Sequence, residues 1–100
     1  MQTNYELIDN VDSKRYEFQI GEYRPRLEYI KAANKIFLTH TEVPKDLAGK
    51  GIGSALIKAV LEEVEKLGLT LVPLCPFVAL YIQRNPEWRK LVMKGINITE

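Results

Sequence analysis

The chain has 100 residues and a net charge of +1, and 46% of its residues are hydrophobic. This length predicts one domain with a modest core, and the near-neutral charge gives no support to binding of nucleic acid or an anionic membrane. No apolar run reaches the roughly 18 residues of a membrane span, the polar N-terminus lacks a signal-peptide core, and the single cysteine fits a reducing compartment. We therefore expect a cytoplasmic protein, either a monomer or at most a weak homodimer.

The first half of the chain predicts strands. Apolar and polar residues alternate after a turn-like segment at 10–14, so 15–20 is expected to form a half-buried strand. Further strands are predicted over 26–32 and 35–43. Pro44 ends the last of them, because proline has no N–H group for a ladder.

The second half predicts helix, strand and helix. Residues 55–67 contain no glycine or proline, and their apolar residues recur at helical spacing. A buried strand over 70–75 should lie parallel to the strand before the helix, as in a βαβ crossover. Proline then begins a helix over 76–84 and a last short helix at Pro86. The fold class is therefore α+β or α/β, with a mixed, mostly antiparallel central sheet, one βαβ crossover and packing helices.

A glycine-rich loop precedes the predicted central helix, with glycine at positions 49, 51 and 53. A loop of this kind leaves unpaired N–H groups at the positive end of the helix dipole, where a phosphate can bind. A tight strand-to-helix turn explains the same residues about equally well. The spacing is neither that of a P-loop, since no lysine lies between Gly53 and Ser54, nor that of a dinucleotide fingerprint.

Two ionisable residues, His40 and Glu42, follow Ile36 and Leu38 at a spacing of two. Strict alternation predicts all four side chains on one face of the strand, with Phe37, Thr39, Thr41 and Val43 on the other. A histidine and a glutamate there could order water or accept a proton from an amine. The alternative is that both residues lie at the exposed rim of the sheet, or that His40 is a hydrogen-bonded core residue.

Cys75 and Tyr81 are further candidates. Cys75 follows a predicted parallel strand and directly precedes a helix, at the end of the sheet where α/β proteins bind ligands. Such a position also stabilises thiolates in general, although most free cysteines are small buried hydrophobic residues. Tyr81 is the one polar group among apolar neighbours on the following helix, and it is equally suited to a core position with a hydrogen-bonded hydroxyl.

Taken together, the sequence resembles the GCN5-related N-acetyltransferases, in particular their small single-domain branch, which includes the YjdJ-like bacterial proteins. The resemblance rests on three motifs between residues 5 and 95. They are His40-Thr41-Glu42-Val43-Pro44, Gly49-Lys50-Gly51-Ile52-Gly53-Ser54-Ala55-Leu56, and the segment from Pro73 through Cys75 and Tyr81 to Glu87. Two positions depart from the family pattern, because Ala48 replaces an arginine or glutamine and Asn85 replaces a histidine.

The resemblance implies that the third and fourth core strands separate to admit coenzyme A. It implies that main-chain groups of Thr41, Glu42 and Val43 pair with the pantetheine arm. Amides of the glycine loop would hold the pyrophosphate, namely those of Gly49, Lys50, Gly51, Ile52, Gly53 and Ser54. Tyr81 matches a tyrosine that often protonates the leaving thiolate. The chain lacks the helices that commonly wall the acceptor site, so the resemblance also implies an open acceptor side.

The sequence thus predicts an acetyl-CoA-dependent N-acetyltransferase that acts on an amine, with no metal site. Glu42 or His40 would serve as the base, acting directly or through water, and Tyr81 or Cys75 as the acid. A variant of this mechanism makes Cys75 an acetylated nucleophile. The alternative function is a module of the same fold that binds coenzyme A or a protein and has lost turnover.

Overall fold

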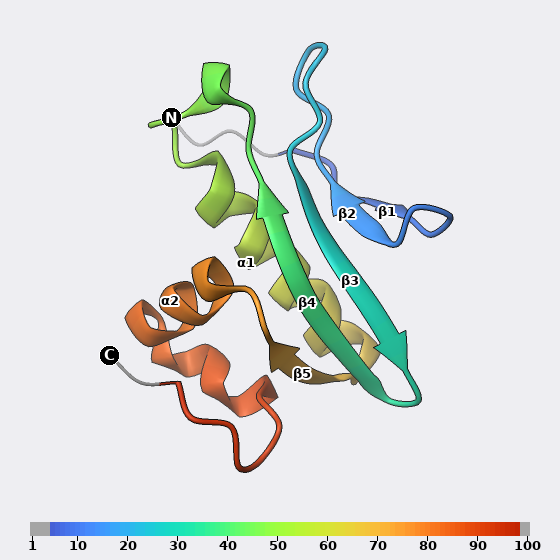
Figure 1. The fold of residues 1–100 in the computed structure, drawn as a ribbon, viewed down its shortest axis with the longest axis vertical. Helices are drawn as coiled ribbons and strands as arrows, with labels where there is room; N and C mark the ends of the chain where they lie inside the picture. Colours follow the sequence, from blue (N-terminus) through green and yellow to red (C-terminus); the bar gives the residue numbers. More distant parts are fainter. Residues whose placement is uncertain (1–4, 99–100) are drawn as a thin grey trace.

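The computed structural model describes residues 5–98 and contains a mixed sheet of five strands with the order β1-β2-β3-β4-β5 (Figure 1). The strands are β1 (Ile8–Asn10), β2 (Arg15–Glu17), β3 (Arg26–Ala32), β4 (Lys35–Glu42) and β5 (Thr70–Pro73). The helices are α1 (Ile52–Leu67) and α2 (Pro76–Arg84), with the 3₁₀ turns η1 (Lys45–Leu47) and η2 (Pro86–Leu91). Only β4 and β5 are parallel, and α1 connects them. The predicted fold class is confirmed.

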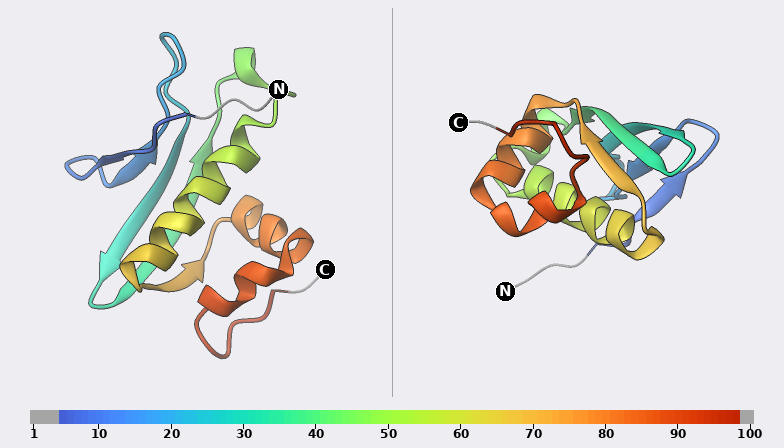
Figure 2. Two further views of the ribbon diagram at one scale, coloured as in Figure 1. Left: turned by 180° about the vertical axis from the view of Figure 1, so that it is seen from behind. Right: turned by 90° about the horizontal axis from the view of Figure 1, so that it is seen from below.

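The core lies between α1 and one face of the sheet (Figure 2). The buried face of α1 carries Leu56, Ile57, Val60, Leu61 and Val64, each fully shielded from solvent. The strands meet it with alternate side chains, and these are Tyr16, Leu27, Tyr29, Ile36 and Leu38. No described helix covers the opposite face of β2, β3 and β4, which we call the outward face (Figure 2).

A β-bulge interrupts β4. Glu28 pairs with His40 but the next residue of β3, Tyr29, pairs with Leu38, so Thr39 is an extra residue without a partner in β3. One extra residue reverses the faces of everything beyond it. Thr41 therefore lies in the inner row with buried Leu27, whereas His40 and Glu42 lie on the outward face. The prediction that these two residues continue the apolar row of Ile36 and Leu38 is wrong for this reason.

Several predicted boundaries also change. β1 was not predicted, because its three residues have no clear period of two. β2 ends at Glu17, three residues early. The Phe18 N–H still donates to the Pro25 carbonyl, but Pro25 has no N–H to return the bond, and an isolated bridge then joins Ile20 to Tyr23. β5 ends at Pro73, although the Cys75 N–H still donates to the Leu38 carbonyl before Pro76 begins α2. None of the described helices is long and apolar enough to span a membrane.

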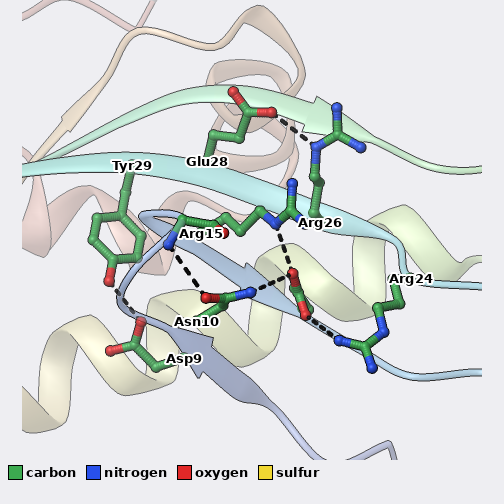
Figure 3. A network of polar contacts seen from close by, with 9 residues as sticks. Asp9, Asn10, Arg15, Arg24, Arg26, Glu28 and Tyr29 are labelled. Carbon is green, nitrogen blue, oxygen red and sulfur yellow. Dashed lines mark hydrogen bonds and ion pairs between the residues drawn. The ribbon is translucent and has the colours of Figure 1, made fainter.

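Glu17 is fully buried although its side chain is on the outward face. Its carboxylate accepts hydrogen bonds from Arg15 Nε at 2.6 Å, from Asn10 Nδ2 at 3.2 Å and from an Arg24 guanidinium nitrogen at 3.2 Å (Figure 3). Burial acts to raise the pKa of Glu17, but the hydrogen bonds from Arg15 and Asn10 and the charge of Arg15 outweigh it, so that this pKa is lowered. The carboxylate thus ties β1, β2 and the loop before β3 together.

Replacing Glu17 with glutamine should lower the free energy of unfolding at pH 7 by about 1–3 kcal/mol, because hydrogen bonds to a charged group are lost. The folded-state pKa of Glu17 lies below its ordinary value of 4.5. Its contribution is therefore present above that value and disappears as the pH falls through the folded-state pKa. Urea unfolding of both proteins between pH 7 and pH 3 should show the difference narrowing. A difference independent of pH would mean that the carboxylate charge does not stabilise the fold.

Candidate functional site

The parallel pairing of β4 with β5 stops before β4 does. The last paired residues are Leu38 and Pro73, and the Cys75 N–H then donates to the Leu38 carbonyl at 2.9 Å. β4 continues for four residues to Glu42, while the other chain turns away into α2 (Figure 1). The last part of β4 is thus free of β5, and the two backbones diverge from this point. We call this divergence of the backbones, which the side chains of Thr41 and Cys75 bridge, the cleft.

The glycine loop lies at the end of the cleft. Gly49 and Gly51 have φ angles of 78° and 74°, in the left-handed region, and open space lies where their side chains would be. Gly51 is the N-cap of α1, without a side-chain cap, and its carbonyl accepts from the Ala55 N–H at 3.0 Å. The N–H groups of Ile52, Gly53 and Ser54 therefore precede the intrahelical ladder. The first turn carries no acidic residue, so the dipole is free to attract an anion.

A pocket of about 240 Å³ opens at this loop. Val43, Leu47 and Phe77 provide its apolar walls, and its remaining lining comes from residues 48, 49 and 51–54. Gly53 is buried, and a Cβ atom there would lie 2.9 Å from Cε2 of Phe77. The third glycine therefore allows the Phe77 ring to approach α1. A larger hollow of about 380 Å³ between Arg89 and the segment 92–98 shares no lining residue with this pocket.

A contact between distant segments holds the start of the loop. The Tyr23 hydroxyl, in the β2–β3 connection, donates to Asp46 in η1. This hydrogen bond raises the pKa of Tyr23, with a smaller effect of burial. Leu47, beside Asp46, is buried and joins the core. The segment between β4 and the glycine loop is thus held both by a polar contact and by packing.

His40 and Glu42 form a pair on the outward face, with 2.9 Å between Nε2 and Oε1. Their side chains are 54% and 51% exposed. The hydrogen bond from His40 lowers the pKa of Glu42, and the charge of Arg26 acts in the same direction. Glu42 is consequently a weaker base than an ordinary glutamate and a good partner for the imidazole.

Thr41 and Cys75 form a second pair across the cleft, with 3.3 Å between Oγ1 and Sγ. Cys75 is only 5% exposed and belongs to the core cluster, and it does not line the pocket at the glycine loop. Its position after β5 and before α2 agrees with the expected place at the cleft, but its thiol is buried rather than open to solvent. Because His40 and Thr41 point to opposite faces, the two polar pairs lie on opposite sides of β4.

Tyr81 lies one turn of α2 beyond Phe77, about 6 Å along the helix. Burial and then the charges of Glu87 and Glu62 raise its pKa. Its side chain is partly buried against the core, and its hydroxyl makes no hydrogen bond with Cys75 or His40. Asn85 ends the same helix, since its side-chain Nδ2 donates to the Tyr81 carbonyl at 2.9 Å.

Comparison with known proteins bears on these features. A sequence profile of the GCN5-related N-acetyl-transferase family matches residues 15–91. The chain belongs to this family. Its fold is similar to the solution structure of a GCN5-like protein of Staphylococcus aureus, with a TM-score of 0.69 and 22% sequence identity over 96% of this chain and 94% of that chain. No curated protein matches the sequence.

Within this member of the GCN5-related family, sequence reasoning missed Phe77 and Leu47 as pocket walls and the Thr41 hydroxyl as a partner of Cys75. A weak signal for Phe77 was available, because a large apolar residue follows Pro76 at the start of a helix. The Thr41 contact depends on the bulge at Thr39, for which the sequence has no glycine or other marker. Among residues 5–98, no group of histidine, cysteine, aspartate and glutamate is arranged to hold a metal ion.

Gly51→Ala should lower the free energy of unfolding by about 1–2 kcal/mol, because alanine is strained at a φ of 74°. Gly51→Asn is the matched control. Asparagine adopts left-handed angles more readily, and open space lies at this Cβ position, so its loss of stability should be clearly smaller. Urea unfolding measures both. Equal losses would show that side-chain volume, and not the backbone angle, matters at this position.

Proposed function

We propose that this chain is an acetyl-CoA-dependent N-acetyltransferase that acts on an amine, and that it belongs to the small, YjdJ-like branch of its family. The observation that carries the proposal is the unpaired end of β4 beside the glycine-loop pocket. A free strand edge can bind an extended amide-containing arm, and the adjacent helix N-terminus can bind its phosphates. The cytoplasmic location expected from the single cysteine stays a prediction.

The residues present suit this cofactor. The amides of Ile52, Gly53 and Ser54, with those of residues 49–51, would bind the pyrophosphate, and the left-handed glycines leave the space that the phosphates need. Main-chain groups of Thr41, Glu42 and Val43 would pair with the pantetheine arm. Acetyl-CoA supplies an acetyl group already activated as a thioester. The chain must orient it, keep water away and manage the protons of the amine and the thiol.

For the proton of the amine, the geometry favours His40 over Glu42. The lowered pKa of Glu42 makes it a poor base but suits it to accept a hydrogen bond from the imidazole. Imidazole is the side chain that ordinarily changes charge between pH 5 and 8. We infer that His40 accepts the proton and that Glu42 orients the ring, with the amine arriving from the outward face.

For the proton of the leaving thiol, Cys75 and Tyr81 remain the candidates. Cys75 lies where β4 and β5 separate and touches the Thr41 hydroxyl. Tyr81, with a raised pKa, keeps its proton at neutral pH and can donate it if the bound thiol reaches the second turn of α2. The burial of Cys75 argues against its serving as an acetylated nucleophile.

The second candidate function is a module that binds coenzyme A without turnover. Ala48 favours it, because the methyl side chain at this exposed position cannot donate a hydrogen bond to a phosphate. Both functions require the pocket, and only the enzyme requires His40.

Isothermal titration calorimetry and thiol release from acetyl-CoA separate these functions. Gly53→Val should abolish binding of coenzyme A, because the added side chain clashes with Phe77 and both residues line the pocket. Lys66→Ala, at the other end of α1, is the matched control and should bind as the wild type does. His40→Gln should retain binding but slow amine-dependent thiol release by about a hundredfold. Binding without acceleration by polyamines, amino acids or peptide N-termini would favour the module.

Cys75 should stay unmodified when the protein is exposed to acetyl-CoA without an amine. Cys75→Ala should then reduce turnover only as far as the lost packing requires. If Cys75 were instead the nucleophile, both Cys75→Ala and Cys75→Ser would be nearly inactive. Intact-protein mass spectrometry followed by peptide mapping decides the matter. A stoichiometric acetyl group on Cys75 that leaves when an amine is added would overturn the direct mechanism.

A further inference from the structure

We propose that the outward face of β2, β3 and β4 binds a zwitterionic acceptor, whose amine lies at His40 and Glu42 and whose carboxylate lies against Arg24 and Arg26. The proposal rests on the proposed function and names the class of amine that the site accepts. Its basis is the arrangement of charged residues on a sheet face that no described helix covers (Figure 2).

The strand register places six ionisable residues in two rows across this face. Glu17, Arg26 and Glu42 form one row, because Glu17 pairs with Arg26 and Arg26 with Glu42. Arg15, Glu28 and His40 form the other row in the same way. The carboxylates of Glu17, Glu28 and Glu42 thus alternate with the guanidinium groups of Arg15 and Arg26, and His40 lies beside Glu28 and Glu42. The bulge at Thr39 completes the pattern, because it turns His40 and Glu42 outward.

Buried Glu17 makes this pattern uneven. Its negative charge is fully shielded, while the arginines that it binds remain 32% and 54% exposed. The β2 side of the face therefore presents guanidinium groups to solvent, and the β4 side presents Glu42, which is 51% exposed, beside His40. A carboxylate is attracted to the first side and an ammonium group to the second. This charge order is complementary to a zwitterion in one orientation only.

The guanidinium groups retain donors for a ligand. Arg15 and Arg26 each use Nε in their ion pairs, with Glu17 at 2.6 Å and Glu28 at 2.8 Å, and Arg24 uses one terminal nitrogen. A guanidinium carries five N–H donors, so each group keeps terminal N–H groups outside these ion pairs. Figure 3 shows the side chains of Arg15, Arg24 and Arg26 near one another beside β2 and the start of β3. Forked donors of this kind suit a carboxylate.

The spacing sets the length of the acceptor. Neighbouring strands lie about 4.8 Å apart. The backbones of β3 and β2 are therefore roughly 5 and 10 Å from β4, the strand that carries His40. An extended peptide spans at most about 3.5 Å per residue, so the N-terminal amine and C-terminal carboxylate of a dipeptide or tripeptide fit this interval. An acidic side chain next to a free N-terminus offers the same chemistry.

Triglycine and triglycine amide are the matched probes, since both carry the same amine and only the first carries a carboxylate. In the wild type, kcat/KM for thiol release should be at least tenfold higher with triglycine. Arg24→Gln and Arg26→Gln should each reduce this ratio to below threefold. Arg84→Gln, on the last turn of α2, should keep the ratio. Gly-Glu-Gly amide distinguishes the two sources of carboxylate, because a preference for it over triglycine indicates a protein N-terminus as the acceptor.

A titration that needs no turnover separates this proposal from the proposed function. Triglycine, but not its amide, should shift the arginine Nε–Hε resonances in the NMR spectrum, and Arg24→Gln should weaken that binding. Binding of this kind without any acetylation would support the carboxylate site and count against the enzyme. Equal acetylation of triglycine and its amide would support the enzyme and overturn the carboxylate site. Circular dichroism verifies that Arg24→Gln is folded, as the exposure of Arg24 leads us to expect.

Discussion

The end of the β4–β5 ladder at Pro73 is the constraint on which the candidate site depends. The hydrogen bond from the Cys75 N–H to the Leu38 carbonyl is the last backbone hydrogen bond between the two segments, and Pro76 then begins α2. Beyond this point β4 keeps its pairing with β3 but has a free edge toward α2. The cleft, the glycine-loop pocket at its end and the buried thiol at its base all follow from one strand continuing where its neighbour stops.

The second determinant is the bulge at Thr39. Strict alternation would have turned His40 and Glu42 toward the core and Thr41 outward. With the bulge, His40 and Glu42 face solvent and Thr41 faces Cys75. A site of this kind can receive two partners from two sides of a single strand, one along the cleft and one across the open sheet face. The family's transfer reaction requires two ligands to meet. The bulge lets them reach β4 from its two faces and adds only one residue to the strand.

The sequence sufficed for the elements whose patterns are long and regular. The periodic residues of 55–67 and the prolines at 44, 73, 76 and 86 fixed α1, β4, β5 and α2 closely. It did not suffice for β1, because a three-residue edge strand owes its existence to pairing with β2. The sequence named candidate site residues but not the faces on which they lie, because a bulge without glycine depends on long-range register. The role of Glu17 was equally invisible, since only the fold brings Asn10, Arg15 and Arg24 to one carboxylate.

The strand order has a kinetic consequence. Each strand of β1-β2-β3-β4-β5 is hydrogen-bonded to the next strand in the chain, and three of the four pairings are antiparallel neighbours joined by short connections. Loop closure for these pairings costs little entropy, so the meander can form early. The β4–β5 pairing must wait for α1 to form and pack. The two walls of the cleft thus belong to segments that assemble at different stages, and the same boundary is where native-state opening should begin.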